Sequence, residues 1–125
     1  MALLNSGCDF VYIHVEAPDE CGHQGDAHGK VRAIEHIDKE VLGRILPEME
    51  RRGEEYSVLL MPDHPTPLAL RTHTGEPVPF VLWRSAGPVT SGISRYCEAD
   101  ARKTGLIVKD GHTLMDMFIK KPGRS

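Results

Sequence analysis

Two runs of strand-forming residues, each followed at once by acidic and histidine side chains, constrain this chain more than any other feature. Residues 10–15 (FVYIHV) are rich in β-branched and aromatic types and apolar almost throughout. This pattern predicts a strand buried on both faces, at the centre of a parallel sheet. Residues 56–61 (YSVLLM) predict a second buried strand. Because α/β sheets bind ligands beyond the carboxyl ends of their parallel strands, the residues that follow are candidates for a functional site.

Segments rich in glycine, proline and ligand-type side chains follow both strands. Residues 16–26 contain Pro18, Gly22 and Gly25, which disfavour regular structure, so we predict a loop there. Residues 62–67 (PDHPTP) form a second segment of this kind. The two strands therefore deliver acids and imidazoles to one edge of the predicted sheet.

Between these strands, apolar residues recur every three or four positions, which predicts one long helix from about His28 to Arg52. Gly53 is expected to end it. The apolar positions are Val31, Ile34, Ile37, Val41, Ile45 and Met49. After this helix and the second strand, residues 77–83 predict a third strand that starts near Phe80, because two prolines precede it.

The last third of the chain predicts smaller elements. We expect a short helix over 94–101, a short strand over 106–108 and a helix over 113–120 that ends before Pro122. Alternating strands and helices of this kind are typical of an α/β fold.

Composition narrows the class of protein. A length of 125 residues fits a single domain, residues 1–125. Fifteen Lys plus Arg against 18 Asp plus Glu, without a dense basic run, predict no nucleic-acid partner. No apolar run is long enough to span a bilayer and no signal peptide is recognised, so we expect no membrane association and a cytoplasmic protein. Three scattered cysteines without a CxxC pair indicate a reducing compartment.

Five residues are candidate metal ligands: Asp19, His23, Asp63, His64 and His73. Two strand ends that each provide an Asp and a His, with a third His nearby, favour a site for Zn or Mn, which accept mixed carboxylate and imidazole ligands. The structural alternative stays open for each one alone. A loop histidine is usually solvated, and an Asp can cap a turn or form an Asx-turn.

Several of these residues lie in strings that resemble a known family. Residues 19–25 (DECGHQG), the Asp63–His64 pair and residues 73–79 (HTGEPVP) resemble the D-x-x-G-H-x-G, D-H and H-T-x-x-P-V-P blocks of cofactor-independent phosphoglycerate mutases. These enzymes belong to the alkaline phosphatase superfamily. Three further strings resemble the archaeal-type, 2,3-bisphosphoglycerate-independent branch of this family: residues 15–19 (VEAPD), 35–38 (EHID) and 61–67 (MPDHPTP).

The resemblance implies a fold and a metal site. The fold would be an alkaline-phosphatase-like three-layer α/β/α arrangement around a mostly parallel sheet, of which this chain holds the C-terminal part. The site would hold two divalent ions, Mn or Zn with Mg as an alternative. Asp19, His23 and His73 would bind one ion, while Asp63 and His64 would bind the other together with an Asp and a Ser from an earlier part of the family's sequence.

The resemblance also implies a reaction, the interconversion of 3-phosphoglycerate and 2-phosphoglycerate through a phosphoserine in glycolysis and gluconeogenesis. Only nine residues precede the first predicted strand. We therefore expect a C-terminal fragment without the nucleophilic Ser, inactive alone, and assign no catalytic residue in it. Strand edges left open by such a truncation predict self-association.

Two other functions remain alternatives. One is another member of the superfamily, such as a phosphatase, a phosphopentomutase or a homoserine-kinase-like protein. The other is a metal-binding module without turnover. Lys30, Arg32, Arg71 and Arg84 are interpreted as ordinary surface charges, and Cys21 as a structural residue within the metal segment.

Overall fold

The computed structural model describes residues 5–120, which form two compact units. The first unit comprises the chain up to Glu54 together with Thr66–Thr74. The second comprises Glu55–Pro65 and the chain from Gly75 onward. The prediction of one domain over 1–125 stays a prediction. Within residues 5–120, no helix combines the length and apolar character needed to cross a membrane.

The first unit contains a helix where the sequence predicted a loop. Helix α2 covers Ala17–Gln24, and two of the three residues taken as helix breakers, Pro18 and Gly25, lie at its ends. Pro18 lies in the first turn, where its missing N–H has no partner to lose. Gly22 is buried within the helix, and Gly25 ends it with φ 70°, the left-handed conformation that glycine adopts readily. The loop prediction for residues 16–26 was therefore wrong.

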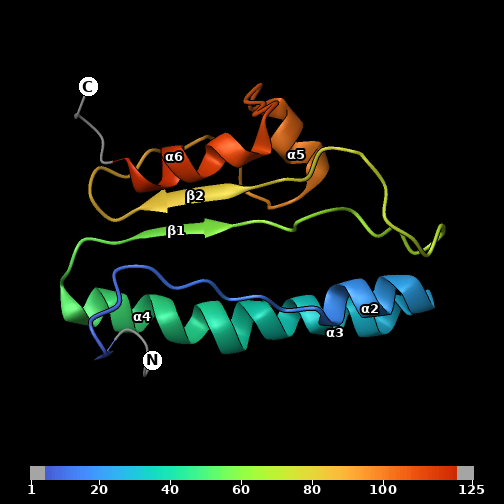
Figure 1. Ribbon diagram of the computed structural model, residues 1–125, viewed down its shortest axis with the longest axis horizontal. Coiled ribbons are helices and arrows are strands. Elements are labelled where there is room, and N and C mark those ends of the chain that lie inside the picture. The colour runs from blue at the N-terminus through green and yellow to red at the C-terminus, as the bar shows by residue number, and fades with distance from the viewer. Residues whose placement is uncertain (1–4, 121–125) are drawn as a thin grey trace. The chain divides into compact units, whose positions relative to one another are not determined.

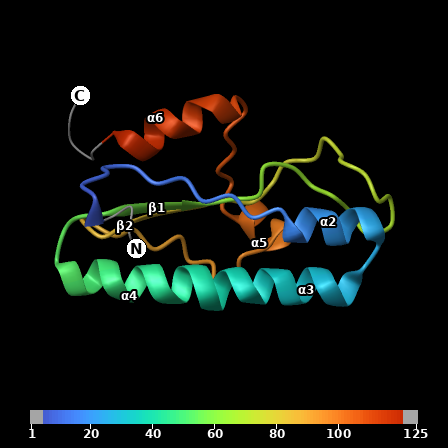
Figure 2. The same cartoon turned by 60° about the horizontal axis from the view of Figure 1, so that its bottom comes forward.

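A long helical rod follows α2 and confirms the predicted helix. It consists of α3 (Ala27–His36), the π-helical stretch η1 (Ile37–Leu42) and α4 (Gly43–Arg52), and Figure 2 shows them as one continuous rod. Asp26 caps the start of α3, since its Oδ1 accepts a hydrogen bond from the Gly29 N–H at 2.8 Å. Gly53, with φ 66°, ends α4 as predicted. Helix α2 packs beside α3 in both views.

Residues 10–15 do not form the predicted central strand. They are extended, but no strand pairs with them among residues 5–120. All of these residues except the half-buried Val11 are exposed, Tyr12 to 73%. A strand needs a neighbour to satisfy its backbone groups, and the local pattern that suggests a strand carries no information on whether that neighbour is present.

The second unit contains a two-stranded sheet. Strand β1 (Ser57–Leu60) pairs with β2 (Val81–Arg84), with Ser57 opposite Arg84 and Leu60 opposite Val81. This confirms the second predicted strand and the start of the third just after Phe80. The two strands are antiparallel (Figure 1), so the expected mostly parallel sheet is wrong for the strands that the structure describes.

Short helices complete the second unit. Helix α5 covers Glu98–Lys103, starting later than predicted. The 3₁₀ turn η2 (Gly111–Thr113) leads into α6 (Leu114–Ile119), which packs on β1 and confirms the last predicted helix. Residues 106–108 form no strand, and Pro122 lies outside the described residues.

Polar side chains fix these short elements. The Arg84 guanidinium donates to the carbonyls of Met117 and Phe118 at the C-terminal end of α6. Hydrogen bonds from Arg95 and Lys103 lower the pKa of Asp100. The Tyr96 hydroxyl donates to the Pro79 carbonyl at 2.9 Å. Burial, with a smaller contribution from the charge of Glu98, raises the pKa of Tyr96 to about 12.

At the coarse level, the part of the chain that the structure describes is an α/β structure with a small two-stranded sheet.

Candidate metal centre

Three of the five predicted ligands come together in the first unit. Asp19 and His23 lie four residues apart on α2, so both side chains project from the same face of the helix. His73 comes from the segment Thr66–Thr74. The Nε2 atom of His23 lies 3.3 Å from Asp19 Oδ2, and the Nε2 atom of His73 lies 3.2 Å from Asp19 Oδ1. The two Nε2 atoms are 3.1 Å apart.

These separations suit a shared metal ion. Nitrogen and oxygen ligands about 2.1 Å from a tetrahedral ion lie about 3.4 Å from one another, close to the 3.1–3.3 Å observed. One ligand atom from each of the three residues can be chosen with all of them within 4.8 Å. The side chains of Asp19, His23 and His73 are 34%, 42% and 50% exposed, so an ion can reach them from solvent. The donor set therefore fits a divalent ion of the Zn or Mn type.

Two further residues of the same unit contact these ligands. The Thr66 hydroxyl donates to Asp19 Oδ1. His23 Nδ1 lies 3.0 Å from the Arg71 carbonyl oxygen. Because a carbonyl can only accept, Nδ1 of His23 carries a proton, and in the neutral ring the lone pair is on Nε2, which faces Asp19 and His73.

Asp63 and His64 belong to the second unit, where they contact each other. The His64 N–H donates to Asp63 Oδ1 at 3.1 Å, and His64 Nε2 lies 3.4 Å from Asp63 Oδ2. Adjacent residues in a bend between two prolines can form such contacts without a ligand, so this geometry does not distinguish the metal interpretation from a local turn. The role of this pair in metal binding stays a prediction.

Sequence reasoning missed Thr66 and Arg71. Thr66 lies within residues 61–67 (MPDHPTP), which resemble the archaeal-type mutases, but its residue type alone predicts no role for it. Arg71 was interpreted as a surface charge, and its exposure agrees with that. Its contact with His23 is made by the backbone carbonyl, which every residue type has, so the sequence cannot indicate it. The positive φ of Arg71, 54°, is likewise invisible in the sequence.

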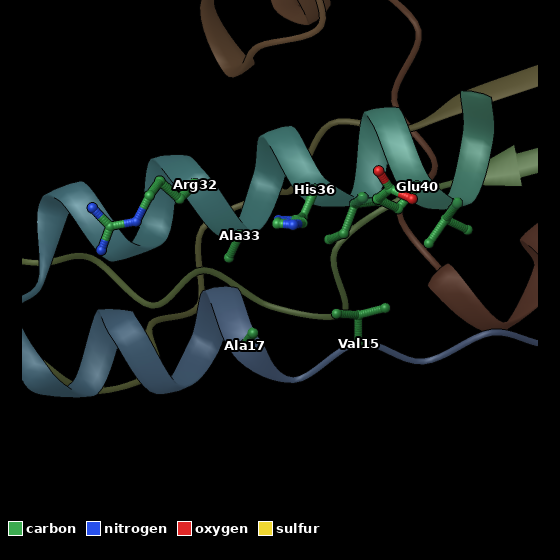
Figure 3. Close-up of a pocket in the computed structure, with 8 residues that line it drawn as sticks. Val15, Ala17, Arg32, Ala33, His36 and Glu40 are labelled. Carbon is green, nitrogen blue, oxygen red and sulfur yellow. The ribbon is translucent and has the colours of Figure 1, made fainter. Parts of the chain in front are cut away.

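A groove of about 390 Å³ lies elsewhere in the first unit, between the segment that leads into α2 and the α3–η1 rod (Figure 3). The groove is lined by apolar residues that include Val15, Ala17 and Ala33. Three polar residues, Arg32, His36 and Glu40, also line it. Its lining is mostly apolar. A phosphorylated substrate needs several convergent polar groups, so the groove does not match the predicted substrate.

Comparison with known proteins identifies the family. The sequence profile of the Metalloenzyme superfamily matches residues 1–121. The chain belongs to the Metalloenzyme superfamily. This agrees with the cluster formed by Asp19, His23 and His73 and with the resemblance that the sequence motifs indicated.

Relatives within the superfamily are named phosphoglycerate mutases. The chain is 50% identical over 113 residues to a probable 2,3-bisphosphoglycerate-independent phosphoglycerate mutase of Geobacter sulfurreducens, which covers 90% of this chain and 28% of the relative. It is 42% identical over 111 residues to the mutase of Methanothrix thermoacetophila, covering 89% and 28%. A second mutase of Methanothermobacter thermautotrophicus is 43% identical over 116 residues, covering 93% and 28%.

The match confirms the predicted resemblance to the archaeal-type mutases. The chain spans little more than a quarter of the length of these relatives, 28%. No solved structure matches it significantly.

Proposed function

We propose that this chain supplies a three-ligand divalent metal site to a phosphoryl-transfer enzyme of the cofactor-independent phosphoglycerate mutase type. The observation that carries the proposal is the convergence of Asp19, His23 and His73 from two segments of the chain. The two histidine Nε2 atoms lie 3.1 Å apart, and each lies 3.2–3.3 Å from a different oxygen of Asp19. The names of the relatives supply the reaction class.

In this proposal each side chain has a defined task. Asp19, His23 and His73 hold one ion, and Asp63 and His64 contribute to a second. Such ions supply positive charge that stabilises the oxygens of a transferring phosphoryl group. His23 and His73 contribute ring nitrogen atoms as ligands, and Asp19 contributes a carboxylate, whose negative charge raises the affinity for a cation. We assign no nucleophile among the 125 residues.

The proposed substrate is a small phosphorylated acid, 3-phosphoglycerate, which is isomerised to 2-phosphoglycerate in the cytoplasm. Mn and Zn are the proposed ions because the ligands combine imidazole nitrogen with carboxylate oxygen, whereas Mg prefers oxygen ligands and retains water. The proposed fold is the three-layer α/β/α arrangement of the alkaline phosphatase superfamily.

A metal titration tests the site directly. The purified chain is titrated with Mn and with Zn, and its metal content is measured by elemental analysis. We expect stoichiometric binding that Asp19→Ala and His73→Ala both abolish. Asp38→Ala and His28→Ala, exposed residues of the neighbouring helix, are the matched controls and should bind like the wild type. Wild-type metal binding by both Asp19→Ala and His73→Ala would exclude this site.

An assay with 3-phosphoglycerate tests the reaction. We expect the chain alone to be inactive and a longer polypeptide that contains it to form 2-phosphoglycerate when loaded with Mn or Zn. Release of inorganic phosphate without 2-phosphoglycerate would instead support a phosphatase of the same superfamily. Metal binding without turnover on any phosphorylated substrate would support a non-catalytic module.

A further inference from the structure

The segment that carries His73 also contacts both metal ligands of α2. We propose that Thr66 and Arg71 are positioning residues, which hold Asp19 and His23 in the geometry needed for metal binding before an ion arrives. This inference rests on the proposed function, because it assumes that Asp19, His23 and His73 bind a metal. It adds residues that act on the ligands without touching the ion.

Thr66 fixes the carboxylate of Asp19. Its hydroxyl donates to Asp19 Oδ1, and the residue is only 5% exposed, so water competes poorly for this hydrogen bond. With Oδ1 engaged, the carboxylate keeps one orientation, in which Oδ2 faces His23 Nε2 at 3.3 Å. A hydrogen bond to a metal-binding carboxylate commonly orients it in this way.

Thr66 itself is held between α2 and α3. The Lys30 Nζ of α3 donates to the Thr66 carbonyl oxygen at 2.7 Å. On the α2 side, a Cβ at Gly22 would lie 2.7 Å from the same carbonyl oxygen and 2.8 Å from the Thr66 methyl carbon. Gly22 therefore permits an approach that no other residue type would allow. Thr66 is fixed on both sides, which makes its hydroxyl a rigid donor.

Arg71 fixes the ring of His23. Its carbonyl oxygen accepts the Nδ1–H of His23 at 3.0 Å, which in the neutral ring places the lone pair on Nε2, and Nε2 is directed at the cluster. Among residues 5–120, Arg71 is the one residue other than glycine with a positive φ, 54°. That conformation is costly for a side chain with a Cβ and is often found at functional sites.

The Arg71 side chain contacts α2 a second time. A Cβ at Gly25 would lie 2.7 Å from Arg71 Nε, so the guanidinium packs directly against the C-terminal turn of α2. A cation at that end of a helix interacts favourably with the helix dipole. Arg71 thus holds the helix through its side chain and orients His23 through its backbone. Binding of an ion then requires little ordering of Asp19 or His23.

A pair of Thr66 variants tests the hydroxyl. Thr66→Val keeps the shape and removes the donor, while Thr66→Ser keeps the donor and removes the methyl group. We expect Thr66→Val to weaken Mn binding by about 10- to 100-fold and Thr66→Ser to stay close to the wild type. Thermal unfolding followed by circular dichroism shows whether each variant is folded. Wild-type Mn affinity in a folded Thr66→Val would overturn the role of Thr66.

A pair of Arg71 variants tests the backbone carbonyl. Glycine adopts positive φ without strain, whereas a β-branched residue resists it. We expect Arg71→Gly to keep the Nδ1–H tautomer of His23 and Arg71→Val to lose it, as read from the nitrogen and carbon chemical shifts of the ring in the metal-free protein at a pH where the imidazole is neutral. Arg71→Val should also weaken Mn binding by about 10-fold or more. An unchanged tautomer and unchanged affinity in Arg71→Val would overturn the role of Arg71.

The two proposals fail in different ways. If wild-type protein binds neither Mn nor Zn, the proposed function is wrong and the positioning role falls with it. If Asp19→Ala abolishes binding while Thr66→Val and Arg71→Val bind normally, the metal site stands and only the positioning inference is overturned. Should Thr66→Val not fold, the Arg71 pair decides, because its tautomer measurement needs no metal.

Discussion

The chain contains two Asp–His pairs, and they are held in different ways. In the first unit, Asp19 and His23 lie four residues apart on a helix, and each is contacted by a residue about fifty positions away in sequence. In the second unit, Asp63 and His64 are neighbours, and the contacts described for them are with each other. Helical spacing places two ligands on one face, where a third segment can approach them. The described contacts between Asp63 and His64 follow from their being neighbours in a proline-flanked bend.

Replacing one histidine of each pair gives the largest expected difference. His23→Ala removes a ligand from the three-residue cluster, so we expect a loss of Mn and Zn affinity larger than the roughly 10- to 100-fold that changes around a metal ligand produce. His64→Ala should leave the first ion bound as in the wild type. Isothermal titration calorimetry of both variants measures this. Equal losses in the two variants would mean that the pairs act together at one site.

The packing beneath the cluster gives the next largest effect. Gly22→Ala places a Cβ 2.7 Å from the Thr66 carbonyl oxygen, and relief of such a contact costs roughly 1–3 kcal/mol. Alanine regains at most about 1 kcal/mol through its higher helix propensity. We therefore expect a net decrease in the free energy of unfolding, measured by chemical denaturation. Gly75→Ala is the control, because a Cβ there meets no atom within 4 Å. A more stable Gly22→Ala would contradict the close approach of Thr66.

The second unit should respond to changes that leave the cluster intact. Arg84→Met removes the donors to the carbonyls at the end of α6. We expect a loss of about 1 kcal/mol in the free energy of unfolding, with metal affinity unchanged. Arg102→Met, at an exposed position of α5, should stay within about 0.5 kcal/mol of the wild type. A change in metal affinity with Arg84→Met would show that the cluster depends on the second unit.

The smallest effect concerns Tyr96 at high pH. Its pKa is raised from 10.0 to about 12 in the folded chain, chiefly by burial. The folded state therefore holds the phenol proton more tightly than the unfolded state, and its contribution to stability is complete below pH 10. As pH rises from 10 towards 12, we expect that contribution to be lost. Phenolate absorbance should show a late-titrating tyrosine that Tyr96→Phe removes. Tyr96 is 46% exposed as a residue, and titration of all tyrosines near pH 10 would show that its partial burial does not hold the phenol proton.

Local signals in the sequence predicted the elements that local interactions determine. The helical rod, its end at Gly53, strand β1 and the start of β2 all follow from periodicity, a left-handed glycine or flanking prolines. Helix α2 was missed because Pro18 lies in its first turn and Gly25 just beyond its end, where neither breaks a helix, while the interior Gly22 is the point where Thr66 packs closely against the helix. Whether residues 10–15 are paired, and whether β1 and β2 run parallel, depends on contacts between distant segments, which the pattern of each segment does not encode.

The candidate ligands were visible in the sequence because their chemistry is in their side chains. The residue types of Asp19, His23 and His73 are common metal ligands, so the sequence alone indicates a candidate metal site. Thr66 does not, since a buried hydroxyl looks the same in a sequence whether or not it orients a carboxylate. Arg71 is harder still, because its contact with His23 comes from a carbonyl that every residue has. Roles that reside in the backbone become visible only when the fold is known.

The π-helical stretch η1 determines where the rod can gain or lose a residue during evolution. A π turn closes its hydrogen bonds one residue later than an α turn and amounts to a single inserted residue. Apolar residues Ile37, Val41 and Ile45 recur every fourth position across it, a spacing that would drift around a regular α-helix. Deleting one residue of Ile37–Leu42 should therefore restore α geometry there and leave α4 facing as it does now. A one-residue deletion among descendants of this sequence is thus expected within Ile37–Leu42 rather than in α3 or α4, where it would rotate the rest of the rod by about 100°.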